Sequence, residues 1–168
     1  MSKHSLKEAA KAILMLVALA LVTACAGYSP SAVQPGMDIA QVQALMGPPA
    51  ARYAQSDGGS RLEYPRGPMG LHTFMVDLDA QGRVLGWQQV LTEAQFNAIQ
   101  PGISAQELLR RVGRPAQVRG GGRQGGQVWS YRFDSWACQW WQVSVTDGVV
   151  GHAAYGNDPR CEFREFRP

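Results

Sequence analysis

The chain has 168 residues, of which 45% are hydrophobic and 17% charged, and its formal net charge is +3 at pH 7. All three lysines precede residue 12, so residues 25–168 hold 13 arginines against 12 acidic residues and are nearly neutral. This balance argues against nucleic-acid binding, which requires a basic surface. The length fits one ordinary domain or two small ones.

A short apolar segment follows the N-terminal lysines. Residues 12–24 are apolar or small without interruption, and these 13 residues fall short of the roughly 20 that a membrane-spanning helix needs. A short apolar run behind lysines is typical of an export signal. The run ends in Val22-Thr23-Ala24-Cys25, which resembles the lipobox of bacterial lipoproteins. The alternative is an ordinary secretory signal with a cysteine near its end.

The lipobox resemblance implies a modification and a location. Residues 1–24 would be removed as a lipoprotein signal peptide, and Cys25 would carry several acyl chains, palmitate among them, which together give stable membrane anchoring. The residue after Cys25 is Ala26 rather than Asp. By the enterobacterial sorting rule this favours the outer membrane, with the protein facing the periplasm. Residues 25–34 would then form a lipidated tether.

Two further cysteines, Cys138 and Cys161, remain after lipidation of Cys25. An even pair in an oxidising compartment predicts a disulfide. Two unrelated free thiols are the alternative. A zinc site is disfavoured because no Cys-x-x-Cys pair or histidine cluster accompanies them.

An internal repeat organises the rest of the chain. Residues 35–49 align with residues 101–115, with proline and glycine identical at both ends of the aligned stretch. The alignment continues with a one-residue slip, so that Leu62-Glu63-Tyr64 falls on Trp129-Ser130-Tyr131. A repeat of this length indicates two tandem units rather than the turns of a solenoid.

Each repeat predicts short helices followed by strands. Asp38, Ser104 and Thr92 are expected N-caps, each with Gln or Glu three residues later. Gly47 and Gly113 are expected to end their helices. Alternating segments such as residues 74–79, 129–134 and 140–145 predict strands with one buried face. We therefore predict an α+β fold of two tandem ααβββ repeats, at 35–91 and 92–168, each a pair of short helices packed on a three-stranded antiparallel sheet.

The repeated pattern of Pro-Gly, a capped short helix, Gly-x-Pro and a strand meander resembles the SmpA/OmlA (BamE-like) family of outer-membrane lipoproteins. The resemblance implies an accessory role beside the β-barrel assembly complex. The duplication departs from the single-unit family pattern and resembles the architecture of the β-lactamase inhibitory protein. We therefore expect a protein-binding module in outer-membrane protein assembly or envelope integrity. The alternative is an inhibitor-like binder of a periplasmic hydrolase.

Aromatic residues suggest where a partner binds. The alternation places Trp129, Tyr131, Phe133 and Trp141 in the core. Trp140 has the opposite phase and would share an open sheet face with Arg132, and Trp87 would also point outward. Exposed Trp and Arg are typical of binding hot spots. The predicted partner-binding residues are therefore Trp140, Arg132 and Trp87.

The sequence offers no catalytic or metal-binding constellation. After the signal segment, the only histidines are His72 and His152, and neither has a nucleophile or carboxylate at a recognisable motif spacing. Residues 120–126 are glycine-rich but match no phosphate-binding motif. We predict that the protein is not an enzyme and requires no cofactor or metal.

Overall fold

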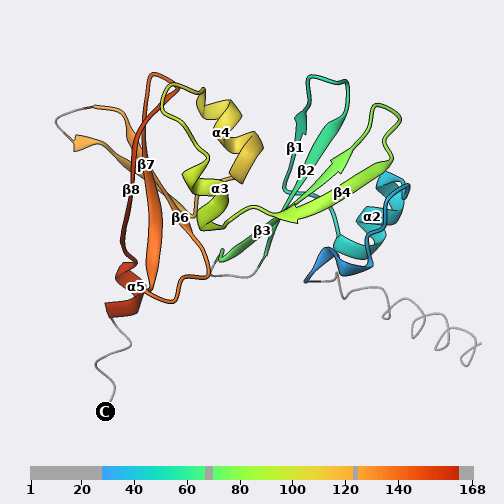
Figure 1. The fold of residues 1–168 in the computed structure, drawn as a ribbon, viewed down its shortest axis with the longest axis horizontal. Coiled ribbons are helices and arrows are strands. Elements are labelled where there is room, and N and C mark those ends of the chain that lie inside the picture. Colours follow the sequence, from blue (N-terminus) through green and yellow to red (C-terminus); the bar gives the residue numbers. More distant parts are fainter. Residues whose placement is uncertain (1–27, 67–69, 123–124, 163–168) are drawn as a thin grey trace, which may run out of the picture.

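A computed structural model describes residues 28–66, 70–122 and 125–162 of the chain. The eight strands in these ranges form two antiparallel sheets of four strands each, in the orders β1-β2-β3-β4 and β5-β6-β7-β8 (Figure 1). The first sheet contains β1 (Ala51–Ala54), β2 (Ser60–Arg66), β3 (His72–Leu78) and β4 (Val84–Gln89). The second contains β5 (Gln117–Gly120), β6 (Gln127–Arg132), β7 (Gln139–Thr146) and β8 (Val149–Asn157).

Short helices accompany each sheet. A 3₁₀ turn, η2 (Pro30–Ala32), and the helix α2 (Ile39–Met46) precede the first sheet. Helices α3 (Glu93–Asn97) and α4 (Ala105–Val112) precede the second sheet, and α5 (Pro159–Glu162) follows it. Within the described ranges, every helix is too short or too polar to span a bilayer.

The predicted pair of ααβββ repeats is wrong. Each sheet has four strands rather than three, and from residue 28 onward only one α-helix precedes the first sheet, so the fold is mostly β. The two strands that the sequence analysis missed are β1 and β5, which are four residues long. Both are edge strands with a single large apolar side chain each, Tyr53 and Val118, so they lack the alternating hydrophobic pattern that reveals a half-buried strand.

The predicted caps explain where the helices begin and end. The Asp38 carboxylate accepts from the Gln41 backbone N–H, and the Gln41 side chain returns a bond to Asp38, which completes the predicted capping box. Ser104 caps α4, but the Glu107 carboxylate binds Arg110 and Arg111 instead of returning to the cap. The expected box is therefore half formed there.

The two repeated Pro-Gly pairs join each helix to the last strand of its sheet. The Gly36 N–H donates to the Val84 carbonyl at 2.8 Å, and the Gly102 N–H donates to the Val150 carbonyl at 2.7 Å. Both glycines have a strongly positive φ, at +86° and +94° respectively. Glycine adopts this backbone conformation without the steric cost that a Cβ imposes. The motif thus pairs a chain segment with the beginning of β4 and of β8, on strand edges that are otherwise open.

Each sheet buries one face in its own apolar core. The core of the first sheet lies against α2, and that of the second lies against α3 and α4 (Figure 1). Tyr131, Phe133 and Trp141 are buried as predicted, whereas Trp129 is half-buried at the margin. The first core comprises Val33, Val42, Met46, Leu62, Tyr64, Phe74, Val76, Leu78 and Val84. The second comprises Leu91, Phe96, Ile99, Leu108, Val112, Tyr131, Phe133, Trp141, Val143 and Val150.

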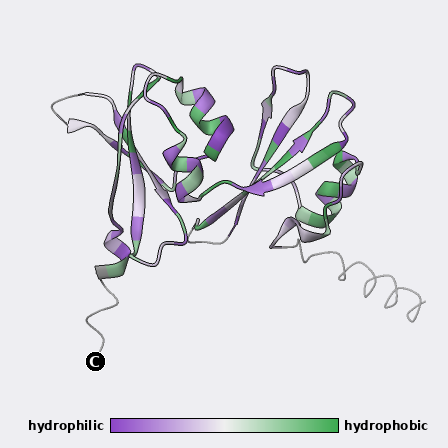
Figure 2. Cartoon of the chain, viewed as in Figure 1, coloured by the Kyte–Doolittle hydropathy of each residue, from purple (hydrophilic) through white to green (hydrophobic). Residues whose placement is uncertain are grey.

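The helix α4 lies between the two sheets and contacts both (Figure 1). It is visibly more hydrophilic than α2 (Figure 2). Its apolar residues Leu108 and Val112 pack in the second core, while its Arg110 carbonyl accepts from Arg61 of the first sheet at 3.3 Å. The polar side of α4 therefore faces the first sheet, on the more polar sheet face that lies opposite α2.

A buried carboxylate fixes this contact between the two sheets. Glu63 on β2 is fully buried on the face opposite α2. Its Oε2 accepts from the Tyr53 hydroxyl at 2.5 Å, and its Oε1 accepts from the Arg114 backbone N–H at 2.9 Å. Burial and the adjacent Glu63 raise the pKa of Tyr53 well above its usual range, so Tyr53 remains a donor. Glu63 thus joins the first sheet to the end of α4.

We predict that Glu63→Ala lowers the free energy of unfolding by about 2–6 kcal/mol, because it leaves the two donors without a partner and each unsatisfied buried donor costs roughly 1–3 kcal/mol. Urea unfolding of the soluble residues 26–168 measures the change. The matched control is Glu93→Ala at an exposed position. Equal stability of the two variants would show that Glu63 does not hold the sheets together.

Candidate functional site

Of the three cysteines with a predicted role, the structure describes Cys138 and Cys161. The signal peptide and the lipidation site Cys25 lie outside the described residues. Cys138 and Cys161 are paired as a disulfide, with Cα atoms 6.2 Å apart, in agreement with the predicted pairing. This bond ties the short helix α5 to the start of β7.

Residues 28–34 belong to the folded body rather than to a free tether. The Val33 side chain is 2% exposed in the first core. The Tyr28 hydroxyl is hydrogen-bonded to His72 Nδ1 at 2.6 Å, and Arg66 donates to the Tyr28 carbonyl at 2.9 Å. The predicted tether 25–34 is therefore wrong for residues 28–34, and its first three residues lie outside the described residues. In the sequence, only Ala26 and Gly27 separate Cys25 from this packed segment.

The predicted open face around Trp140 and Arg132 is also wrong. These residues lie on the face of the second sheet opposite α3 and α4, as the alternation indicated, but their exposed fractions are only 5% and 6%. The segment after β8 covers them. Asp158 forms an ion pair with Arg132 at 2.7 Å, and the Arg132 guanidinium lies over the Trp140 ring at 5.4 Å. Trp140, Arg132 and Asp158 thus form a small buried cluster and do not offer a contact surface.

Trp87 is exposed as predicted, but it lies on the core face of the first sheet, opposite Val76 of β3, rather than on the expected open face. It lies on β4 with an exposed fraction of 40%, and its ring packs edge-on against Phe74 at 5.9 Å. Leu85, two residues earlier, is 57% exposed. A β-bulge between β3 and β4 at Asp77 and Leu78 inserts the extra residue on β4 and shifts the strand's alternation there. Two large apolar side chains are thus presented on one short strand.

The strand that carries them is an edge strand. Within the described sheet, β4 pairs only with β3. The Pro-Gly segment occupies the outer edge at Val84 alone, through the bonds of Val84 with Gly36 and Met37. An edge strand presents a row of backbone donors and acceptors to which an extended peptide can be added. Residues 85–89 therefore combine an available edge with exposed apolar anchors.

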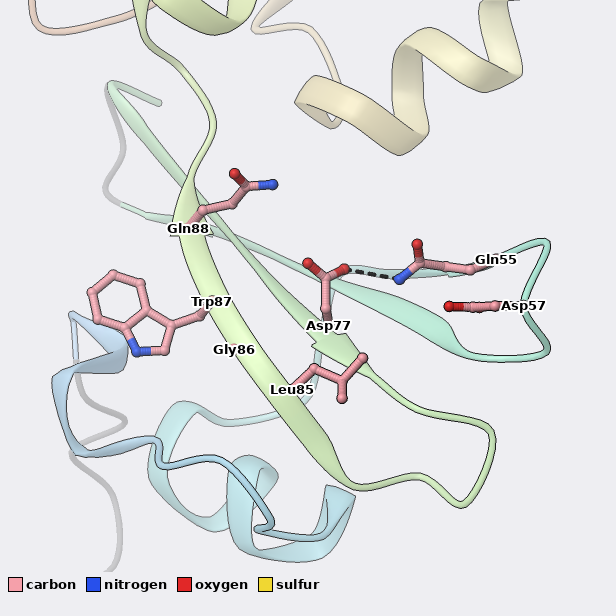
Figure 3. Close-up of a pocket in the computed structure, with 7 residues that line it drawn as sticks. All are labelled: Gln55, Asp57, Asp77, Leu85, Gly86, Trp87 and Gln88. Atoms are coloured by element: carbon pink, nitrogen blue, oxygen red, sulfur yellow. Dashed lines mark hydrogen bonds between the residues drawn. The ribbon is translucent and has the colours of Figure 1, made fainter.

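A shallow polar hollow of about 400 Å³ lies beside this edge (Figure 3). Asp77 forms its base and is held by Arg61 at 2.6 Å and by Gln55 Nε2 at 2.9 Å. Asp77 is therefore paired and serves to orient the Gln55 amide. The hollow thus joins amide and carboxylate groups to the Leu85 side chain, while the Trp87 ring points to the other side of β4 (Figure 3). Its lining residues are Gln55, Asp57, Asp77, Leu85, Gly86, Trp87 and Gln88.

The groups around this hollow have the chemistry to bind a peptide. Gln55 and Gln88 provide amides that can both donate and accept hydrogen bonds, as recognition of a peptide backbone requires. Leu85 and Trp87 provide apolar area that is lost from water on binding. Among the described residues, no group of His, Cys, Asp and Glu could hold a metal ion. His72 is engaged with Tyr28.

Sequence reasoning missed most of the hollow. Leu85 belongs to the site because of a β-bulge, which has no signature in the sequence. Gln55 and Asp57 come from the hairpin after β1, a strand that was not predicted. The available signal was Trp87 itself, which pointed to the correct strand, but its expected open-face phase was wrong because the bulge places it opposite Val76 on the core face.

We predict that Trp140→Ala lowers the free energy of unfolding by about 3–5 kcal/mol, as loss of a buried aromatic side chain does. The matched control is Trp136→Ala, because Trp136 is 97% exposed and surface substitutions usually stay within about 0.5 kcal/mol. Chemical unfolding monitored by circular dichroism measures both. A neutral Trp140→Ala would restore the open-face interpretation.

We also predict a loss of stability in acid that depends on Asp158. Burial alone would raise the pKa of Asp158, but the hydrogen bonds from Arg132 and Arg160 and their charges outweigh it and hold the pKa below its usual value. The folded state thus binds the proton less readily than the unfolded state, whose pKa is about 3.9. Asp158 stabilises the fold above that pH, and this contribution disappears as the pH falls through the lower, folded-state pKa.

Asp158→Asn should therefore flatten the fall in stability below about pH 4, a range set by the unfolded-state pKa of Asp. Urea unfolding at a series of acidic pH values measures the slope. Asp134→Asn at an exposed position controls for the change in net charge. An unchanged slope in Asp158→Asn would mean that the ion pair with Arg132 does not stabilise the fold.

Comparison of the chain with protein-family models and with curated proteins yields no match. The resemblance to the SmpA/OmlA family therefore rests on the repeated Pro-Gly and Gly-x-Pro residues themselves. The features of this chain that bear on function are the exposed edge strand, the hollow beside it and the N-terminal sequence.

Proposed function

We propose that this protein is a lipoprotein anchored through Cys25 in the outer membrane, where its periplasm-facing body binds another protein by the edge strand β4. The N-terminal lysines, the short apolar run and the lipobox-like Val22-Thr23-Ala24-Cys25 support the anchor. The paired Cys138 and Cys161 suit an oxidising compartment. Ala26 after Cys25 favours the outer membrane.

The observation that carries protein binding is the pairing of Leu85 and Trp87 on an available sheet edge. Both side chains are large, apolar and at least 40% exposed. A partner segment added beside β4 would gain backbone hydrogen bonds from residues 85–89 and would cover both side chains. The amides of Gln55 and Gln88 in the adjacent hollow would receive its polar groups.

The proposed partner is the β-barrel assembly complex. This choice derives from the resemblance of the repeated sequence motif to the SmpA/OmlA family. Anchoring in the same membrane raises the local concentration of such a partner, so a modest interface suffices for stable association. The edge of β4 provides a modest interface of this kind.

Site-specific photocrosslinking in intact cells tests the contact. A photoreactive phenylalanine analogue placed at position 85 or 87 of the full-length lipoprotein should crosslink to a subunit of the barrel-assembly complex. The matched control is position 118, because Val118 is 48% exposed on β5, an edge strand of the other sheet. We predict crosslinks from β4 and none from position 118.

Each result bears on a different part of the proposal. Crosslinks from β4 to an unrelated envelope protein would retain the binding edge and replace the partner. Equal crosslinking from positions 87 and 118 would reject β4 as a specific edge. Growth with a Cys25→Ser variant, followed by membrane fractionation, separately tests the anchor, which predicts release of the protein into the soluble periplasm.

A further inference from the structure

Trp136 is the most exposed large hydrophobic side chain in the described ranges. Its exposed fraction is 97%, and it lies in the connection between β6 and β7. A fully hydrated indole contributes nothing to the core of this fold. Tryptophans in this condition are typical of contact surfaces, where the ring is removed from water upon binding.

The connection that carries Trp136 is held in place from several sides. The Cys138 N–H donates to the Ser135 carbonyl at 3.1 Å and closes a turn around Trp136. Cys138 is bonded to Cys161 in α5, and its carbonyl accepts from the Asp158 N–H at 2.9 Å. A constrained loop loses little conformational entropy when its side chain is bound. Trp136 is thus presented on a preorganised support.

This connection lies on the same edge of the molecule as the beginning of the described chain. Figure 1 shows η2, the start of β3, the β6–β7 connection and α5 along one long edge. The β1–β2, β3–β4 and β7–β8 turns lie along the opposite edge. Tyr28 is fixed to the first edge by its bonds with His72 and Arg66.

The short distance along the chain between Cys25 and Tyr28 limits how far this edge can lie from a membrane. Three residue steps span at most about 10 Å when fully extended. Acyl chains on Cys25 would therefore hold the edge that contains Tyr28 close to the lipid headgroups. Tryptophan favours that region, because its ring is apolar while its N–H still finds a polar partner.

We propose that the β6–β7 connection is a membrane-contact site in which the Trp136 indole enters the headgroup region of the bilayer that holds the Cys25 lipid. This inference rests on the proposed lipid anchor. The anchor sets the distance from the membrane, and Trp136 adds a second contact that fixes the orientation of the body. The ligand is a phospholipid surface, and the opposite edge with its hairpin turns faces the periplasm.

Quenching of tryptophan fluorescence by brominated phospholipid tests this contact. Full-length lipidated protein is reconstituted into vesicles of phosphatidylethanolamine and phosphatidylglycerol, with and without bromine on the acyl chains. The wild type is compared with Trp136→Phe, so that the difference reports Trp136 among the five tryptophans. We expect bromine to reduce the wild-type fluorescence and most of that loss to disappear in Trp136→Phe.

A second variant controls for position on the molecule. Trp136→Phe combined with Gln81→Trp moves the exposed indole to the β3–β4 turn, where Gln81 is exposed on the opposite edge. We expect no bromine-dependent quenching from this indole. Equal quenching from positions 81 and 136 would overturn the proposed orientation.

Flotation of the same vesicles separates failure of this inference from failure of the anchor. If the lipidated protein floats with the vesicles but Trp136→Phe leaves the quenching unchanged, the anchor stands and Trp136 contacts a protein or solvent instead. If the protein fails to float, the proposed anchor itself is wrong, and the membrane contact of Trp136 falls with it.

Discussion

Glu63 belongs to β2 of the first sheet, yet one of its oxygens accepts the Arg114 backbone N–H just past the end of α4. A carboxylate removed from water must be satisfied by donors, and Tyr53 and Arg114 supply them. The position also requires Gly113, because a Cβ there would lie 2.9 Å from Glu63 Oε1 and 3.1 Å from Thr73 Cγ2. Gly113 combines φ of +78° with ψ of −166°, a conformation essentially restricted to glycine. One buried acid and one glycine thus determine how the two sheets pack.

The repeat does not provide this contact a second time. In the repeat alignment, Ser130 takes the place of Glu63 in the second sheet, and Pro48 takes the place of Arg114 after α2. Ser130 is buried and accepts from Gln142 within its own sheet at 3.0 Å. Pro48 has no N–H to donate. The second sheet therefore has no carboxylate at the position of Glu63, and the segment after α2 has no N–H donor at the position of Arg114. The contact that joins the two sheets occurs once in the described residues.

The sequence predicted the local chemistry better than the layer arrangement. The caps at Asp38 and Ser104, the positive φ of Gly47 and Gly113, and the buried phase of Tyr131 and Trp141 all follow from short-range rules that the structure obeys. The strands β1 and β5 escaped prediction because edge strands of four residues are held by their neighbours' backbone rather than by their own pattern. The fold class was wrong for that reason.

The error at Trp140 has a related cause, and it bears on function. Alternation divides a strand's residues between two faces, but whether a face is open depends on what the rest of the chain places over it. Here Asp158, just after β8, pairs with Arg132 beside Trp140; Trp140 is buried, whereas Trp136 lies in solvent. The edge of β4 stays available because the Pro-Gly segment covers only its first residue.

The two exposed tryptophans therefore lie on different sheets that Glu63 and Arg114 hold together. This has a mechanical consequence. A contact between Trp136 and a bilayer would fix the direction in which β4 presents Leu85 and Trp87, because the second sheet cannot turn without the first. A tether alone sets only a distance, whereas a tether with a second contact also sets an angle. For a protein that binds a membrane-embedded partner, a fixed orientation reduces the rotational entropy that is lost on binding and so favours association.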